Sequence, residues 1–316
     1  MSNPEKSDAS LKLSIVTTLY CSEEFVEEFY ARIVAEAERI TQDFEIIFVD
    51  DGSPDHSAEV VLKLLASDKR IRLIELSRNF GHHKAIFCGL SQARGELVFL
   101  IDVDLEEKPE LLSKFYEKLQ EDYDHIDVVY GYMNQRKGGL FERVFGSLFY
   151  FVLNSLTNLK IPKSPIMGRI MKADYVKALL QHQEYQVFIG GLMLIAGFHQ
   201  VPIEVEKTSK GSTTYGFTRK ILQALDAILS FSTKPLVCVC VFGILVAVIS
   251  FVLLIWLVIN RILYPEIPVG YSSLMLSIWF LGGITISSIG LVGLYVGKTF
   301  LQSKARPNYI VRSIHN

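Results

Sequence analysis

The feature that most constrains the fold is a short apolar run that stops abruptly on two acids. Residues 97–101 read LVFLI, and Asp102, Val103 and Asp104 follow directly. A strand-forming run bounded in this way is typical of a buried strand. Side chains alternate along a strand, so we expect both carboxylates to point the same way at its carboxyl end.

Two carboxylates held this close repel each other and raise one pKa unless a cation lies nearby. Oxygen ligands of this kind favour Mg²⁺ or Mn²⁺, which keep coordination positions open for substrate phosphates. The pair Asp102 and Asp104 therefore predicts a metal site. A solvated loop after the strand is the alternative interpretation, because aspartate is common in such loops.

The first hundred residues alternate between strand and helix patterns. Alternation of this kind predicts a parallel sheet with helices packed on it, and hence an α/β fold. Later segments predict a helix from Pro109 to about Gln120 and strands at 127–130 and 199–206. The earlier strand patterns cover 13–19, 44–49 and 71–76, and helical spacing covers 23–40, 58–66 and 83–93.

Polar residues follow several of these strands, where ligands gather in open parallel sheets. Asp51 suits a ribose hydroxyl or a base edge, because a carboxylate accepts two hydrogen bonds. Its alternative role is to cap the Asp-Gly-Ser turn. The chain has no G-x-G-x-x-G fingerprint and no P-loop, which disfavours a dinucleotide or triphosphate cradle. The polar residues on this edge are Tyr20, Asp51, the 78–84 loop, Asp102 and Asp104.

Composition excludes several classes of protein. With 32 Lys and Arg against 34 Asp and Glu, the net charge is −2, so we expect no nucleic-acid partner. The first ten residues have no apolar core, so we expect no cleaved signal peptide. The cysteines lack metal-ligand spacing, which argues against zinc and against a disulfide framework; they are Cys21, Cys88, Cys238 and Cys240.

Two long apolar runs, 235–259 and 273–297, contain no charged residue. Each is long enough to cross the roughly 30 Å hydrocarbon layer of a membrane, so we expect an integral protein of the inner or plasma membrane. Lys and Arg flank the pair on the outer sides, which predicts that 1–206 and both termini are cytoplasmic and that 260–272 is external. Glycines in the second run favour helix contacts and a homo-oligomer.

The segment 207–234 joins the polar domain to the first apolar run. It holds a basic loop followed by an amphipathic helix pattern, which predicts contact with anionic membrane lipid; a solvated loop is the alternative. Residues 141–156 also have an amphipathic pattern, for a helix that lies on the core or on lipid. Residues 298–316 are expected to form a cytoplasmic tail.

Four motifs, in order, resemble those of a known enzyme family. They read DDGSPD at 50–55, SRNFG at 77–81, DVDL at 102–105 and RPNYIV at 306–311. The series is similar to that of the polyprenyl-phosphate glycosyltransferases, membrane-anchored inverting enzymes that include bactoprenol glucosyltransferases and dolichyl-phosphate mannose synthase. The resemblance implies a Rossmann-like, mostly parallel nucleotide-sugar domain of the GT-A type, with interfacial helices and two C-terminal transmembrane helices.

The resemblance implies transfer of a hexose from a nucleotide sugar, with UDP-glucose as the expected donor, to a polyprenyl (undecaprenyl) phosphate at the cytoplasmic face. Mg²⁺ or Mn²⁺ is the implied cofactor, on Asp102 and Asp104. The implied nucleotide-binding residues are Thr18, Tyr20, Glu23, Asp51, Asp102 and Val103. The implied catalytic residues are Asp102, Asp104, Arg136 and Arg169. The residues implied to bind the acceptor phosphate are Lys207, Lys210 and Ser212.

The chain departs from the family pattern at four places. Thr18 and Cys21 stand where the family has proline and asparagine, and 106–109 read Glu-Glu-Lys-Pro instead of Gln-Asp-Pro-Pro. Met167 stands where an acid is expected, in Met-Gly-Arg instead of Asp-Phe-Arg. A phosphate monoester has a second pKa of about 6 and is largely ionised at neutral pH, so this acceptor needs a general base less than a sugar hydroxyl does.

Three other functions fit parts of the sequence. A processive polysaccharide synthase would be expected to have more membrane spans and a Gln-x-x-Arg-Trp motif, and neither is present. A membrane scaffold that binds a nucleotide sugar without catalysis is compatible with Met167. A lipid carrier or flippase fits least well, because the two apolar runs contain no charged residue of the kind that transport usually needs.

Overall fold

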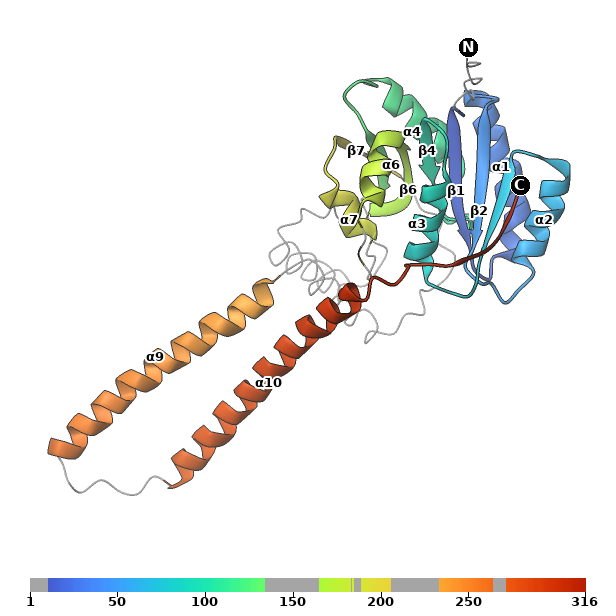
Figure 1. Ribbon diagram of the computed structural model, residues 1–316. Coiled ribbons are helices and arrows are strands. Elements are labelled where there is room, and N and C mark those ends of the chain that lie inside the picture. Colours follow the sequence, from blue (N-terminus) through green and yellow to red (C-terminus); the bar gives the residue numbers. More distant parts are fainter. Residues whose placement is uncertain (1–10, 134–164, 183, 185–188, 206–232, 264–270) are drawn as a thin grey trace, which may run out of the picture. The chain divides into compact units, whose positions relative to one another are not determined.

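The structure is a computed structural model of the full chain. It describes residues 11–133, 165–182, 184, 189–205, 233–263 and 271–316. Two compact units are distinguished, one of 1–151, 159–215 and 307–316 and the other of 152–158 and 216–306. The first unit carries the sheet, and the second carries the long apolar helices (Figure 1).

The first unit is built on one eight-stranded sheet with the order β7-β5-β6-β4-β1-β2-β3-β8. β1 lies at its centre and pairs in parallel with β2 and β4, while β2 pairs in parallel with β3. The expected α/β class with a mostly parallel sheet is confirmed. The strands are β1 Leu13–Leu19, β2 Phe44–Asp50, β3 Ile71–Leu76, β4 Leu97–Leu100, β5 Val128–Tyr132, β6 Pro165–Lys172, β7 Gln200–Glu204 and β8 Val311–His315.

Helices pack on both faces of the central strands. Phe29 of α1 meets Phe48 of β2 edge to face at 6.1 Å, and Phe115 of α4 meets Phe99 of β4 at 6.3 Å. Gly89 of α3 lies close to Val16 of β1. Val16 lies between the two β1 positions that pair with Phe99 and Phe48, so its side chain points to the opposite face of the sheet. The helices of this unit are α1 Glu23–Ile40, α2 Ser57–Ser67, α3 His82–Gln92, α4 Leu111–Gln120, α6 Ala173–Leu180 and α7 Ile189–Ile195.

Two strands have no counterpart in the sequence patterns. β6 lies between β4 and β5 and runs antiparallel to both, although Pro165 and Gly168 weaken its local strand pattern. β8 pairs antiparallel with β3 at the sheet edge and is formed by residues that we expected only as a tail. In both cases, ladder hydrogen bonds to a preformed neighbour outweigh weak local propensity.

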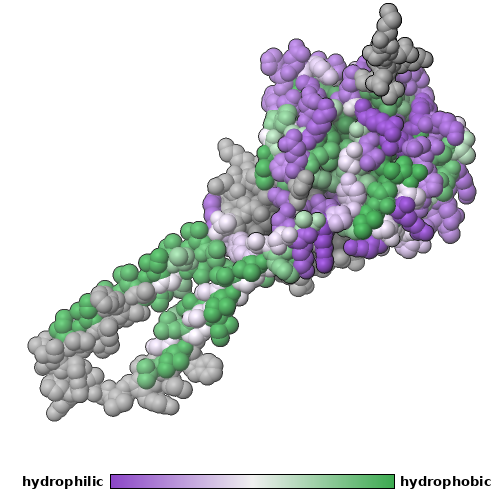
Figure 2. All heavy atoms as spheres, in the orientation of Figure 1, coloured by the Kyte–Doolittle hydropathy of each residue, from purple (hydrophilic) through white to green (hydrophobic). Residues whose placement is uncertain are grey.

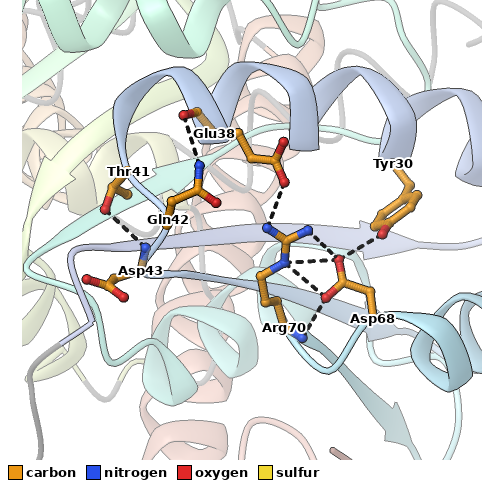
Figure 3. A network of polar contacts seen from close by, with 7 residues as sticks. All are labelled: Tyr30, Glu38, Thr41, Gln42, Asp43, Asp68 and Arg70. Atoms are coloured by element: carbon orange, nitrogen blue, oxygen red, sulfur yellow. Dashed lines mark hydrogen bonds and ion pairs between the residues drawn. The ribbon is translucent and has the colours of Figure 1, made fainter.

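An ion network closes the α2–β3 junction (Figure 3). Arg70 donates to Asp68 and, through Nη1 at 2.9 Å, to Glu38 of α1. Tyr30 donates to Asp68 at 2.8 Å. The hydrogen bonds from Arg70 lower the pKa of Asp68 to about 2, because they outweigh the effect of burial, which raises it. These contacts fix helix α1 against the amino-terminal end of β3.

The second unit contains α9 Lys234–Leu263 and α10 Tyr271–Ser303. Both helices expose large apolar side chains along their length (Figure 2), for example Val248, Trp256 and Ile286. Among the described residues, one stretch, Phe280–Ser303, is long and apolar enough to cross a membrane. Among the described residues of α9, the apolar stretch Lys234–Val246 is too short to cross a membrane by the same measure. The second membrane span therefore stays a prediction.

Candidate functional site

The loop after β1 is fastened to the turn that precedes α2. Cys21, with a φ of +52°, donates its N–H to Ser53 Oγ at 2.7 Å, and Glu23 donates its N–H to Asp55 Oδ2 at 3.0 Å. Burial raises the pKa of Asp55, but hydrogen bonds from Ser53 and Ser57 outweigh it and lower the pKa to about 2. This loop presents Tyr20, which is 52% exposed, at the carboxyl edge of the sheet.

Asp51 lies just beyond β2 and is 2% exposed. Its two carboxylate oxygens accept hydrogen bonds from the backbone N–H groups of Phe80, at 2.7 Å, and Gly81, at 2.9 Å. Burial raises the pKa of Asp51, and these two bonds act in the opposite direction. Asp51 therefore holds the loop after β3 in place, and its predicted contact with a nucleoside would use the lone pairs that remain.

The turn-capping role considered for Asp51 belongs to its neighbour. Both carboxylate oxygens of Asp50 accept from the N–H of Ser53, at 3.2 and 3.3 Å. Burial raises the pKa of Asp50 to about 6. Gly52 has a φ of +64°, and a Cβ there would lie 2.6 Å from the carbonyl carbon of Arg78, so only glycine lets the two loops approach this closely.

His82, the first residue of α3, connects the ends of β1 and β4. Its Nδ1 lies 3.1 Å from Thr18 Oγ1, and its Nε2 lies 3.4 Å from Asp102 Oδ1. Burial lowers the pKa of His82, while the charges of Asp51 and Asp104 raise it. Four of the predicted site residues are therefore gathered around one imidazole, namely Thr18, Asp51, Asp102 and Asp104.

The two predicted metal ligands lie in a turn and not in the strand itself. β4 ends at Leu100, so strand alternation does not set the direction of the carboxylates as we expected. Asp102 and Asp104 are nevertheless both half-buried, whereas Val103 between them is 3% exposed. Asp104 Oδ1 accepts from the N–H of Glu106 at 3.0 Å, and Leu105 has a φ of +59°.

Glu107 connects this turn to β6. Its side chain is 2% exposed and accepts hydrogen bonds from the N–H groups of Met167, at 3.0 Å, and Gly168, at 2.7 Å. A carboxylate from the preceding turn thus lies beside the position where the family pattern has an acid. The approach is close, because a Cβ on Gly168 would lie 2.8 Å from Glu107 Oε2.

Arg169 lies on β6 and is 6% exposed. Its guanidinium donates to the backbone carbonyls of Ile166 and Met167, both at 3.0 Å, and contacts the sulfur of Met193. Burial lowers the pKa of Arg169. Its predicted catalytic role stays a prediction, and in this structure its guanidinium contacts backbone carbonyls at the start of β6.

Known proteins identify the family. The sequence pattern of glycosyl transferase family 2 matches residues 14–180. The chain belongs to this family. A Mycobacterium tuberculosis protein grouped with the glycosyltransferases is 48% identical over 305 residues, 96% of this chain and 89% of that protein. The Escherichia coli prophage bactoprenol glucosyl transferase homolog is 31% identical over 307 residues, 96% and 99% of the two chains.

Solved structures resemble this glycosyltransferase more distantly. A Pyrobaculum calidifontis mannosyltransferase in complex with GDP-Man and Mn²⁺ has a TM-score of 0.49 and 16% identity, over 69% of this chain and 63% of that one. Glucosyl-3-phosphoglycerate synthase of Mycobacterium tuberculosis has a TM-score of 0.45 and 17% identity, over 70% and 80%. Both scores lie below 0.5, so the family assignment rests on the sequence relatives.

The donor set of the glycosyltransferase fits a hard divalent cation that is shared with a ligand. Among the described residues, no group of three or more His, Cys, Asp or Glu side chains could hold a metal ion on its own. Mg²⁺ commonly takes only one or two carboxylates and completes its shell with water and substrate phosphates. The half-buried Asp102 and Asp104 match that requirement.

Several predicted residues of the glycosyltransferase lie outside the described residues, and their contacts stay predictions. They are Arg136, Lys207, Lys210 and Ser212. Two side chains of the described site had no role in the sequence prediction, His82 and Glu107. His82 was noted only as part of the 78–84 loop, and its position at the start of a helix beyond a strand was the available signal.

Proposed function

We propose that this glycosyltransferase moves a hexose from a nucleotide sugar, with UDP-glucose as the first candidate, to a polyprenyl phosphate at the cytoplasmic membrane face. The observation that carries the proposal is the similarity to bactoprenol glucosyl transferases over 96% of this chain and 99% of theirs, which includes the apolar helices. The product would be a polyprenyl-phosphate sugar, inverted at the anomeric carbon.

The residues around His82 support this chemistry. Asp51 and Gly52 fix the loop beside the proposed nucleoside pocket, which Thr18, Tyr20, Glu23 and Val103 would complete. Asp102 and Asp104 would hold Mg²⁺ or Mn²⁺, which when bound stabilises negative charge on a departing nucleoside diphosphate. A rigid edge also favours in-line placement of donor and acceptor, because misplacement of reacting atoms slows transfer.

The acceptor side is proposed from charge and hydropathy. A lipid phosphate is already ionised near neutral pH, so cations that hold it in line matter more than a base. We assign this role to Arg136, Lys207, Lys210 and Arg169, with the hydroxyl of Ser212 as a further hydrogen-bond donor to the phosphate. The 24-residue apolar stretch of α10 would keep the enzyme at the membrane, and α9 would form the second span. Both termini would then be cytoplasmic. The glycines of α10 would allow homo-oligomers to form.

The test is direct. Purified full-length protein in detergent is incubated with Mn²⁺ or Mg²⁺, undecaprenyl phosphate and a panel of labelled nucleotide sugars, and label is measured in the organic phase. We expect label from UDP-glucose, its loss with EDTA, and none with undecaprenol, which lacks the phosphate. UDP binding without transfer from any sugar would instead support a non-catalytic scaffold and overturn the proposal.

A further inference from the structure

His82 occupies a central position on the carboxyl edge of the sheet. In the strand order β4-β1-β2, β1 lies between the strand that leads to Asp102 and the strand that leads to Asp51. From the first position of α3, the imidazole reaches Thr18 on β1 and Asp102 beyond β4. One side chain therefore joins a buried strand to a residue of the proposed metal site.

The partners of the ring determine which nitrogen carries the proton. Nε2 lies 3.4 Å from Asp102 Oδ1, within ion-pair distance, and a donation from it to an ionised Asp102 requires that Nε2 carry a proton, because a carboxylate can only accept. In a neutral ring Nδ1 is then an acceptor, and the hydroxyl of Thr18 must donate to it across 3.1 Å. The direction of donation runs from Thr18 through His82 to Asp102.

The backbone around His82 is held as firmly as its ring. The carboxylate of Asp51 accepts hydrogen bonds from the backbone N–H groups of Phe80 and Gly81, the two residues that immediately precede His82. Gly81 has a φ of +100°, a conformation that turns the chain sharply into α3. The imidazole is therefore fixed from both sides, by its loop and by Thr18.

We propose that His82 is a positioning residue that orients the carboxylate of Asp102 for the divalent cation, with Thr18 setting the tautomer of its ring. This inference rests on the proposed function, because it assumes that Asp102 binds the cation. Outer hydrogen-bond partners of this kind restrict the orientation of a metal ligand, and their loss weakens metal binding about 10- to 100-fold. Thr18 then acts on the cation through His82.

The experiment measures Mn²⁺ affinity of the full-length protein with saturating UDP, by the electron paramagnetic resonance signal of free Mn²⁺. We expect His82→Phe and Thr18→Val each to weaken Mn²⁺ binding about 10-fold or more. Because the two residues act in series, Thr18→Val adds nothing in a His82→Phe background. His82→Gln, which keeps a donor and an acceptor, restores part of the affinity.

Thr17→Val is the matched control for Thr18→Val. Thr17 is fully buried one residue earlier on β1, and its hydroxyl is the one buried side-chain polar atom without a hydrogen-bond partner among the described residues. The same exchange of hydroxyl for methyl there leaves Mn²⁺ affinity unchanged. Melting temperatures of all variants are recorded, so that a loss of folding is separated from a loss of binding.

The outcomes separate the inference from the proposed function. If Asp102→Asn and Asp104→Asn leave Mn²⁺ affinity unchanged, the metal site itself is wrong. If those two variants lose affinity while folded His82→Phe keeps it, only the inference fails. Additive effects of Thr18→Val and His82→Phe would likewise contradict a relay in series, because they would mean that each residue acts independently.

Discussion

The two ends of the central strands hold their buried charges in different ways. At the amino ends, Glu45 of β2 and Arg72 of β3 form an ion pair at 3.1 Å, and Glu45 also accepts from Ser14 of β1. At the carboxyl ends, Asp51 accepts only from backbone N–H groups in the contacts described, and Asp102 faces the imidazole of His82, whose pKa burial lowers.

The difference separates stability from function in one sheet. Charges at the amino ends are neutralised within the protein, which suits a role in fixing the strands. At the carboxyl ends negative charge gathers around His82, which suits a site for a cation and a nucleotide. Arg70 extends the paired arrangement at the amino ends to helix α1 (Figure 3).

Breaking the amino-end pair gives the largest expected effect. Arg72→Ala leaves the buried Glu45 without its cation and lowers the free energy of unfolding by about 3–5 kcal/mol. Urea titration followed by circular dichroism measures this change. The double variant Arg72→Met, Glu45→Gln should lose far less stability than Arg72→Ala, since no buried charge remains. Equal losses of stability in Arg72→Ala and in the double variant would contradict the role of the ion pair.

Asp104→Asn tests the carboxyl end. The loss of a charged ligand removes several kcal/mol of charge stabilisation, so hexose transfer falls at least about 100-fold. The melting temperature stays within about 2 °C of the parent, because the half-buried side chain can still accept the N–H of Glu106. Unimpaired formation of sugar lipid would erase the contrast between the two ends.

Asp50 sharpens the comparison through pH. Its pKa is about 6 in the folded protein against 3.8 ordinarily, so the folded state binds more protons in between, and stability falls as pH rises from about 4 to 6. Asp50→Asn keeps an acceptor for Ser53 and removes this slope. Above pH 7 the variant is more stable by up to about 3 kcal/mol. Urea titrations at pH 4, 5, 6 and 7.5 measure it, and parallel pH profiles would contradict it.

Gly52→Ala has the smallest expected effect, about 2 kcal/mol of stability, because the new Cβ meets the backbone of Arg78 and Asn79 at positive φ. Gly197→Ala is its control, with a φ of +72° but open space around the Cβ. Its loss should be only about 1 kcal/mol. We also expect Gly52→Ala, but not Gly197→Ala, to weaken UDP binding, as measured by calorimetry. Equal UDP affinities of the two variants would mean that the 78–81 loop does not support the site.

Much of the first unit could be predicted from local pattern. β1, α1 and β3 begin and end at the predicted residues, because apolar runs and helical spacing record burial directly. The edge that carries Asp51, Asp102 and Asp104 was also predictable, since parallel strands place their carboxyl ends together. Net charge and the long apolar runs bounded the class of protein.

The tertiary structure decided what depends on pairing between distant residues. The insertion of β6 beside β4 and the addition of β8 at the edge rest on ladders that no local pattern encodes. The same holds for the capping of the turn by Asp50 instead of Asp51, and for the contacts of His82 with Thr18 and Asp102. Sequence fixes which side chains are available at an edge, but hydrogen-bond partners are chosen by distance and direction, and those exist only once the sheet has formed.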